Sequence, residues 1–440
     1  MQVKAARGAC ARPATVKGVD SPPVPGLLLR DHHTEVPLDH ADPGGPTISV
    51  YAREVRAVER AADDLPWLLF LQGGPGGKAP RPTDRSGWLG EAVKDYRVLL
   101  LDQRGTGRSS PVTERTPGRF ADDRALARYL TLFRADSIVA DAEILRARLG
   151  GGRPWTTLGQ SYGGFCTFTY LSSAPQGLER CLVTGGIPGL EASAEDVYRR
   201  TWARVLDKNA EHFRRYPADR SLLNRARDAV AGGRVLLPGG DVLTVARLQA
   251  LGIVLGMSYG SAQVHYLLEE AFDGDELAPA FLAEVEQQTG HASNPLYAVL
   301  QEACYCSGTA SRWAAQRVRE AEFPEASPDA TDLLLTGEMK ESWVFRDEAR
   351  LAPFAGAMEL LHAKEDWPAL YDPGRLARNE VPVAAAVYHD DLYVDAGLSL
   401  ATARATPGVR AWVTNEYEHD GVRADARVFS RLRDLATGRA

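Results

Sequence analysis

The order of apolar and polar positions along the chain predicts a core of strands and helices. Two runs of consecutive apolar residues, at 67–71 and 98–101, are each followed by a glycine-rich segment. Such a run is typical of a strand buried on both faces, as in a parallel sheet. Residues 135–149 instead repeat apolar side chains at helical spacing. Further strand-like runs lie at 48–55, 156–159, 180–185, 381–388 and 409–414, and a last helix is expected near 425–435.

The middle of the chain follows a different pattern. Helical spacing dominates between about residues 191 and 376, and strand-like runs are sparse there. The alternation of strand, glycine turn and helix on either side indicates an α/β fold with a mainly parallel sheet. We therefore predict a core made of residues 1–190 and 377–440, interrupted by a helical cap at 191–376.

Composition and charge exclude several classes of protein. The 440 residues carry a net charge of −7, which argues against a general nucleic-acid binder with a basic face. Five cysteines in a chain of this length do not suggest a disulfide framework. Because no stretch of about 20 apolar residues occurs, we expect no membrane span and a cytoplasmic location. Nothing in the sequence indicates the oligomeric state.

The sharpest local motif is Gly-Gln-Ser-Tyr-Gly at residues 159–163. It follows a predicted strand and precedes a predicted helix, which is the context of a G-x-S-x-G nucleophile turn. A serine on so tight a turn lies close to neighbouring backbone, and the flanking glycines avoid collisions of Cβ atoms. The motif predicts Ser161 as a nucleophile at the N-terminus of a helix.

A serine nucleophile needs a base, and the base needs an orienting acid. In hydrolases with this turn the acid and then the histidine follow later in the chain, past strand ends. We therefore predict Asp391 as the acid and His419 as the base, with Asp390 and Asp395 as competitors for the acid role. A metal site formed by His389 with these aspartates lacks a recognised ligand spacing, so we expect no metal.

Two backbone N–H groups are candidates for an oxyanion hole. One belongs to Tyr162, directly after the nucleophile, and the other to Gly74 in the Gly-rich loop after an early strand. The segment 102–109, Asp-Gln-Arg-Gly-Thr-Gly-Arg-Ser, superficially resembles a phosphate-binding loop. Because it lacks the Gly-Lys-Ser/Thr ending, we expect a structural loop packed beside the active site.

Three motifs together carry a family resemblance. Gly-Gly-Pro-Gly at 73–76, the segment at 102–109 and Gly-Gln-Ser-Tyr-Gly-Gly at 159–164 resemble the proline iminopeptidases, which are α/β-hydrolase-fold serine exopeptidases. The segment 413–421 also looks like the longer members of that family. One departure is Gln72, where many relatives have histidine. The resemblance implies an α/β-hydrolase core with a helical cap. It also implies release of an N-terminal residue, preferentially proline, without a metal or organic cofactor.

The resemblance further implies acidic cap residues that grip the free N-terminus of a peptide substrate. Glu302, in a Glu-x-x-Tyr segment, and Glu338, in Gly-Glu-Met, match the family's segments. Tyr305 and Trp343 are candidate walls for a proline ring, with packing in the protein core as the alternative. Two rival functions remain open: a carboxylic-ester or other acyl hydrolase on the same core, and a catalytically inactive hydrolase fold that serves as a binding module.

Overall fold

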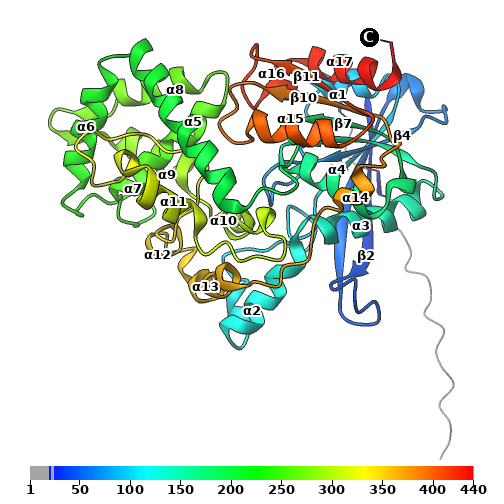
Figure 1. Cartoon of the computed structure of the whole chain (residues 1–440), viewed down its shortest axis with the longest axis horizontal. Helices are drawn as coiled ribbons and strands as arrows, with labels where there is room; N and C mark the ends of the chain where they lie inside the picture. The colour runs from blue at the N-terminus through cyan, green and yellow to red at the C-terminus, as the bar shows by residue number, and fades with distance from the viewer. Residues whose placement is uncertain (1–18, 21–23, 440) are drawn as a thin grey trace, which may run out of the picture.

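The computed structural model describes residues 19–20 and 24–439, and a nine-stranded sheet forms its core (Figure 1). The strands lie in the order β1-β2-β3-β5-β4-β6-β7-β10-β11. Pairings from β5 to β11 are parallel, whereas β1, β2 and β3 pair antiparallel with their neighbours. The predicted α/β fold with a mainly parallel sheet is confirmed. The strands are β1 (Val19–Asp20), β2 (Leu27–Pro37), β3 (Thr47–Ala57), β4 (Trp67–Leu71), β5 (Arg97–Leu101), β6 (Trp155–Gln160), β7 (Leu178–Thr184), β10 (Val383–Tyr388) and β11 (Val409–Thr414).

Helices cover both faces of the sheet, which explains the continuous apolar runs in the sequence. On β4, Leu69 and Leu71 belong to the apolar cluster that includes α3 (Ala135–Leu149) and α4 (Tyr162–Ser173). Leu68 and Phe70 belong to the opposite cluster, which includes residues of α1 (Gly87–Ala92) and α17 (Ala426–Thr437). Alternate residues of one strand are therefore buried on opposite faces. The other core helices are α1 (Gly87–Ala92), α2 (Asp123–Leu130), α15 (Ala396–Ala405), α16 (Gly421–Ala424) and α17 (Ala426–Thr437).

A mostly helical region separates β7 from β10 and lies to one side of the sheet (Figure 1). Several of its helices share an apolar cluster of their own, around Trp202, Leu223 and Phe281. We call this region the cap. Its helices are α5 (Ala194–Arg215), α6 (Asp219–Val230), α7 (Val245–Gln249), α8 (Gly260–Glu269), α9 (Pro279–Thr289), α10 (Pro295–Leu300), α11 (Ala314–Glu322), α12 (Val344–Asp347), α13 (Ala355–Ala363) and α14 (Pro373–Leu376), with a hairpin of β8 (Phe272–Asp273) and β9 (Glu276–Leu277).

The cap is joined to the core by packing as well as by the chain. A further apolar cluster combines Leu126 and Leu130 of α2 with Met358 and Leu361 of α13. At the end of the cap, α14 packs against α4, and its Leu376 belongs to a core cluster. The last turn of the expected cap therefore packs as part of the core.

The parallel strands bring distant parts of the chain to one edge of the sheet. β7 lies between β6 and β10, and β10 pairs with β11. The segments that follow β6, β10 and β11 therefore leave the sheet at the same edge, where α/β proteins place their sites.

Two further predictions concern the whole chain. Within residues 19–20 and 24–439, no helix is long and apolar enough to cross a bilayer. Cys166, Cys181, Cys304 and Cys306 are buried free thiols, and Cys10 lies outside the described residues.

Candidate active site

Ser161 occupies the sharp turn that the motif predicts. β6 ends at Gln160, α4 begins at Tyr162, and Ser161 between them has φ 56° and ψ −124°. Such a conformation is strained for a residue with a side chain, and it persists where surrounding contacts hold it. Here the Ser161 N–H donates to the carbonyl of Thr184 on β7, with an N–O distance of 2.9 Å.

The glycines around Ser161 are required by close backbone contacts. A Cβ atom at Gly159 would lie 2.4 Å from the carbonyl oxygen of Gly163, and one at Gly163 would lie 1.9 Å from that of Leu71. A Cβ at Gly164 would lie 2.2 Å from the carbonyl oxygen of Gly186. The turn is thus packed against β4 and against the loop after β7, so larger residues would displace the serine.

His419 and Asp391 form a buried pair, although 28 residues separate them. The His419 Nδ1–H donates to Asp391 Oδ2 at 2.7 Å, and the other carboxylate oxygen accepts the N–H groups of Tyr393 and Val394 at 2.8 and 3.0 Å. The His419 N–H in turn donates to the carbonyl of Gly256 in the cap. These bonds fix the orientation of the imidazole ring, with Nε2 left for other partners.

The pKa of His419 is raised above its usual value. Burial alone would lower it, but the charge and hydrogen bond of Asp391 favour the imidazolium more strongly, and Glu338 adds to this effect. The pair therefore stabilises the positive charge that a general base acquires when it takes a proton.

The competing carboxylates have other partners. Asp390 bonds to the exposed His389 and lies 3.4 Å from Arg204, while Asp395 caps α15 by accepting the Leu398 N–H. Of the three aspartates considered from the sequence, the structure brings Asp391 alone to His419.

The loop after β4 lies directly against the nucleophile turn. A Cβ atom at Gly73 would be 2.9 Å from Ser161 Cβ, and Gly74, with φ 137°, lines the same cavity as Ser161. As the first residue of α4, Tyr162 has an N–H group without an acceptor inside the helix. The two predicted oxyanion donors thus lie on the segments that flank the serine.

The segment 102–109 supports this loop. The Gln103 side-chain amide donates to the carbonyl of Gln72 at 2.9 Å, and Asp102 accepts the N–H groups of Ala79 and Arg108. The segment therefore anchors the glycine-rich loop by hydrogen bonds to its backbone, as expected for a structural loop beside the site.

Ser161 and His419 line one cavity of about 240 Å³ beneath the cap. Glu338 also faces this cavity, and its two oxygens accept bonds from the Tyr297 hydroxyl at 2.9 Å and the Gln301 amide at 3.0 Å. Burial raises the pKa of Glu338, although His419 and the two hydrogen bonds act in the opposite direction. The cavity thus places a carboxylate opposite a serine and a histidine.

Glu302 lies elsewhere in the cap. It is 2% exposed, and its oxygens accept the N–H groups of Ala314 and Ala315 at 3.0 and 2.9 Å. One oxygen also lies 3.1 Å from His362 Nδ1. The structure does not place Glu302 among the residues that line the cavity, because these contacts hold it at the start of α11.

The two predicted aromatic walls also lie outside this cavity. Tyr305 packs edge-to-face on Phe165 and Tyr198 and lines a separate cavity of about 170 Å³. Trp343 packs against the cluster that joins α2 and α13. Both aromatic side chains therefore pack in the interior of the protein, which was the alternative to a wall for a proline ring.

Several residues that line the cavity or bond to its lining were not predicted. Tyr297 and Gln301 hold Glu338, and the Tyr393 ring packs edge-to-face on His419 at a centroid distance of 4.8 Å. The spacing of four between Tyr297 and Gln301 could have suggested a shared helix face. Tyr393 is two residues from Asp391, but nothing in the sequence marks its contact with the histidine.

Comparison with known proteins identifies the fold and the family of the chain. Residues 66–229 match a family model described as the alpha/beta hydrolase fold. A proline iminopeptidase of Aeromonas sobria is 46% identical over 410 residues, which cover 92% of this chain and 96% of the relative. A proline iminopeptidase of Aspergillus aculeatus is 35% identical over 404 residues, covering 89% of this chain and 90% of the relative. This chain belongs to the proline iminopeptidase family and has the α/β-hydrolase fold of that family.

Proposed function

We propose that this protein is a serine aminopeptidase that releases an N-terminal residue, preferentially proline, from peptides. Its membership of the proline iminopeptidase family carries the proposal. The geometry supports it, because Ser161 and His419 face one cavity and the buried Asp391 orients the histidine.

The proposed reaction proceeds through an acyl-enzyme. His419 Nε2 takes the proton of the Ser161 hydroxyl as the serine oxygen attacks the carbonyl carbon of the first residue. The N–H groups of Tyr162 and Gly74 stabilise the oxyanion. The imidazolium then protonates the leaving amine, and the peptide bond breaks. Water, deprotonated by His419, hydrolyses the ester and releases the amino acid.

We assign recognition of the substrate N-terminus to Glu338. A protonated imino or amino group must lose water to enter the cavity, and a facing carboxylate offsets that penalty. A peptide with a blocked N-terminus would leave Glu338 without this partner, which favours exopeptidase over endopeptidase activity. Tyr297 and Gln301 hold the carboxylate in place through their hydrogen bonds.

Three substrates test the proposal: a prolyl arylamide, its N-acetylated form and a simple carboxylic ester. We expect the free prolyl arylamide to be cleaved fastest and Ser161→Ala to abolish its cleavage. Equal turnover of the free and acetylated arylamides would contradict the amine anchor, and exclusive ester turnover would favour the acyl-hydrolase alternative. Failure of a serine-directed reagent to label Ser161 would favour an inactive binding module.

Two expectations from the sequence remain proposals. We propose a cytoplasmic site of action, which fractionation of cells producing the protein would test. We also retain residues 1–190 and 377–440 as the core and 191–376 as the cap, a division that limited proteolysis would test.

A further inference from the structure

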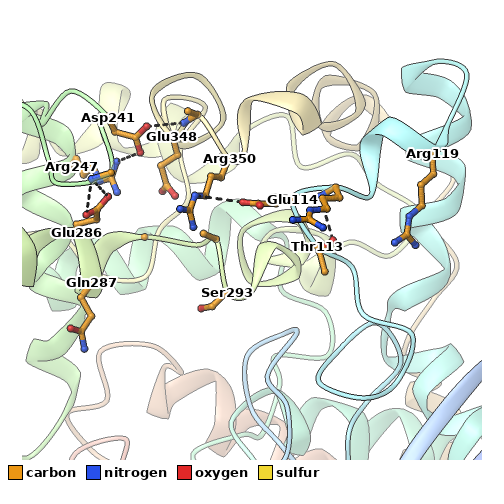
Figure 2. Close-up of a pocket in the computed structure, with 15 residues that line it drawn as sticks. Thr113, Glu114, Arg119, Asp241, Arg247, Glu286, Gln287, Ser293, Glu348 and Arg350 are labelled. Atoms are coloured by element: carbon orange, nitrogen blue, oxygen red, sulfur yellow. Dashed lines mark hydrogen bonds and ion pairs between the residues drawn. The ribbon is translucent and has the colours of Figure 1, made fainter.

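A second, larger cavity lies between the core and the cap. It is a groove of about 900 Å³, lined on the core side by residues 113–115 and 119. The cap lines its other side with parts of the segments 239–247, 286–293 and 348–350 (Figure 2). The groove is therefore formed by two parts of the chain that are distant in sequence.

Most charged side chains of the groove are already paired. Arg350 lies 3.5 Å from Glu114, so that an ion pair joins the cap to the core segment (Figure 2). Deeper in the cap, Arg247 bonds to Asp241 at 2.9 Å.

The two remaining carboxylates also have partners. Glu348 bonds to His291, and Glu286 accepts the Gly239 N–H. These four carboxylates therefore have partners of their own, and none of them is bonded to Arg115 or Arg119.

Two arginines on the core side are different. Arg115 and Arg119 are exposed, and neither side chain makes a hydrogen bond or ion pair with any residue that the structure describes. Figure 2 shows Arg119 on the same segment as Thr113, across the groove from the cap. The core wall of the groove therefore offers two guanidinium groups whose N–H donors have no acceptor among the described residues.

The linings of the groove and of the active-site cavity meet along one segment of the chain. Gly290, Ala292 and Ser293 line the groove, while the next residue, Asn294, lines the cavity that contains Ser161. A peptide bound with its first residue in the cavity must direct its remaining residues outward. Each extended residue spans about 3.3–3.6 Å, so a short leaving peptide is long enough to pass this boundary.

We propose that the groove receives the leaving part of the peptide substrate and that Arg115 and Arg119 bind a carboxylate on it. This inference rests on the proposed aminopeptidase function. The carboxylate is that of the peptide C-terminus or of an acidic side chain, since a guanidinium binds both alike. The groove thus favours short peptides that carry a negative charge a few residues beyond the cleaved bond.

The test compares substrates with and without that charge. Pro-Ala-Ala with a free C-terminus, the same peptide amidated, and amidated Pro-Ala-Glu are assayed beside a prolyl arylamide. With the Arg115→Gln/Arg119→Gln double variant, we expect KM for the free tripeptide to rise about three- to tenfold, as for one or two exposed ion pairs. KM for the amidated Pro-Ala-Ala and for the arylamide should not change.

The control is Arg124→Gln/Arg128→Gln, which removes the same charge from exposed positions of α2 outside the groove. A similar rise in KM for the free tripeptide with this control would mean that positive charge attracts the peptide from a distance, and it would overturn the proposal. An unchanged KM for the free tripeptide in the groove variant, or an equal rise for the amidated form, would also overturn it. A rise for amidated Pro-Ala-Glu identifies side-chain carboxylates as a second ligand. If the wild type cleaves no prolyl substrate, the proposed function itself fails.

Discussion

Glu338→Gln is the most direct test of how the cavity selects its substrate. The substitution keeps the shape of the side chain and removes its charge. The new amide can donate to Gln301 once the Gln301 amide turns over, since Gln301 Oε1 is buried without a hydrogen-bond partner among the described residues. The Tyr297 hydroxyl retains an oxygen acceptor, so we expect the folded structure to survive.

The magnitude follows from the buried position of the carboxylate. An ammonium about 4 Å from a carboxylate gains about 4 kcal/mol at an effective dielectric constant of about 20. Part of this gain offsets the desolvation of the amine, so we expect a net loss of about 3 kcal/mol. That corresponds to a fall of roughly 100- to 200-fold in kcat/KM for a free prolyl arylamide.

A second effect distinguishes this role from simple damage to the fold. Glu338 contributes to the raised pKa of His419, and the base acts only when it is neutral. Loss of the charge lowers the pKa of His419, so the acid limb of the kcat/KM profile should move to lower pH. This shift should also occur with an ester substrate that carries no amine.

The assay measures kcat/KM against pH for the prolyl arylamide and the ester, beside the exposed control Glu325→Gln. Equal losses on both substrates would refute the assignment of Glu338 as the amine anchor, and an unshifted acid limb would refute its effect on the pKa of His419.

Three other substitutions give separate tests. Asp391→Asn should lower kcat about 10⁴-fold and move the acid limb to lower pH, because the carboxylate raises the pKa of His419; a loss below tenfold would contradict the assignment. Glu302→Gln should lower the free energy of unfolding by about 2–4 kcal/mol in a denaturant titration, because the charge of Glu302 holds the start of α11. The KM of the folded variant should stay nearly unchanged, and a selective rise in KM would restore Glu302 as an amine anchor. Burial lowers the pKa of Lys340 from 10.5 to about 8. The charged form of Lys340 therefore lowers the free energy of unfolding by about 3 kcal/mol below pH 8, and by progressively less as the pH rises toward 10.5. Lys340→Met should therefore stabilise the protein at pH 7 and have little effect near pH 10, and an equal effect at both values would refute the reasoning.

The sequence was sufficient to select the proposed catalytic residues because their positions depend on local chemistry. A Cβ atom on any of the glycines around Ser161 would lie 1.9 to 2.4 Å from a carbonyl oxygen, so no other residue type fits there. The glycines therefore identify the turn in the sequence. Asp391 and His419 follow strand-like runs, and parallel strands bring such segments together. The family motifs then favoured a proline iminopeptidase over other hydrolases with the same nucleophile turn.

The cap was less predictable because its side chains are directed by tertiary contacts. Glu302 bonds to backbone twelve residues later, across a turn in which Arg312 and Trp313 have positive φ values of 50° and 56°. Neither residue type signals that conformation. A glutamate that accepts N–H groups at the start of a helix and one that faces a cavity therefore look alike in sequence, and Glu302 and Glu338 were predicted to act together.

Strand β2 was not predicted either, because its pattern contains charged residues that are buried by pairing. Asp31 is bonded to Arg53 and Arg108, and His32 to Glu54 on the neighbouring strand. Hydrophobic periodicity alone does not detect a strand whose polar side chains are neutralised by partners on neighbouring segments.

The insertion of the cap between β7 and β10 has a consequence for biosynthesis. A ribosome makes Ser161 well before it makes the segments that carry Asp391 and His419, since both follow the cap. Until β10 and β11 join the sheet, the nascent chain carries a serine without a base. If the proposed assignment holds, cleavage of free N-termini cannot begin before β10 and β11 have joined the sheet.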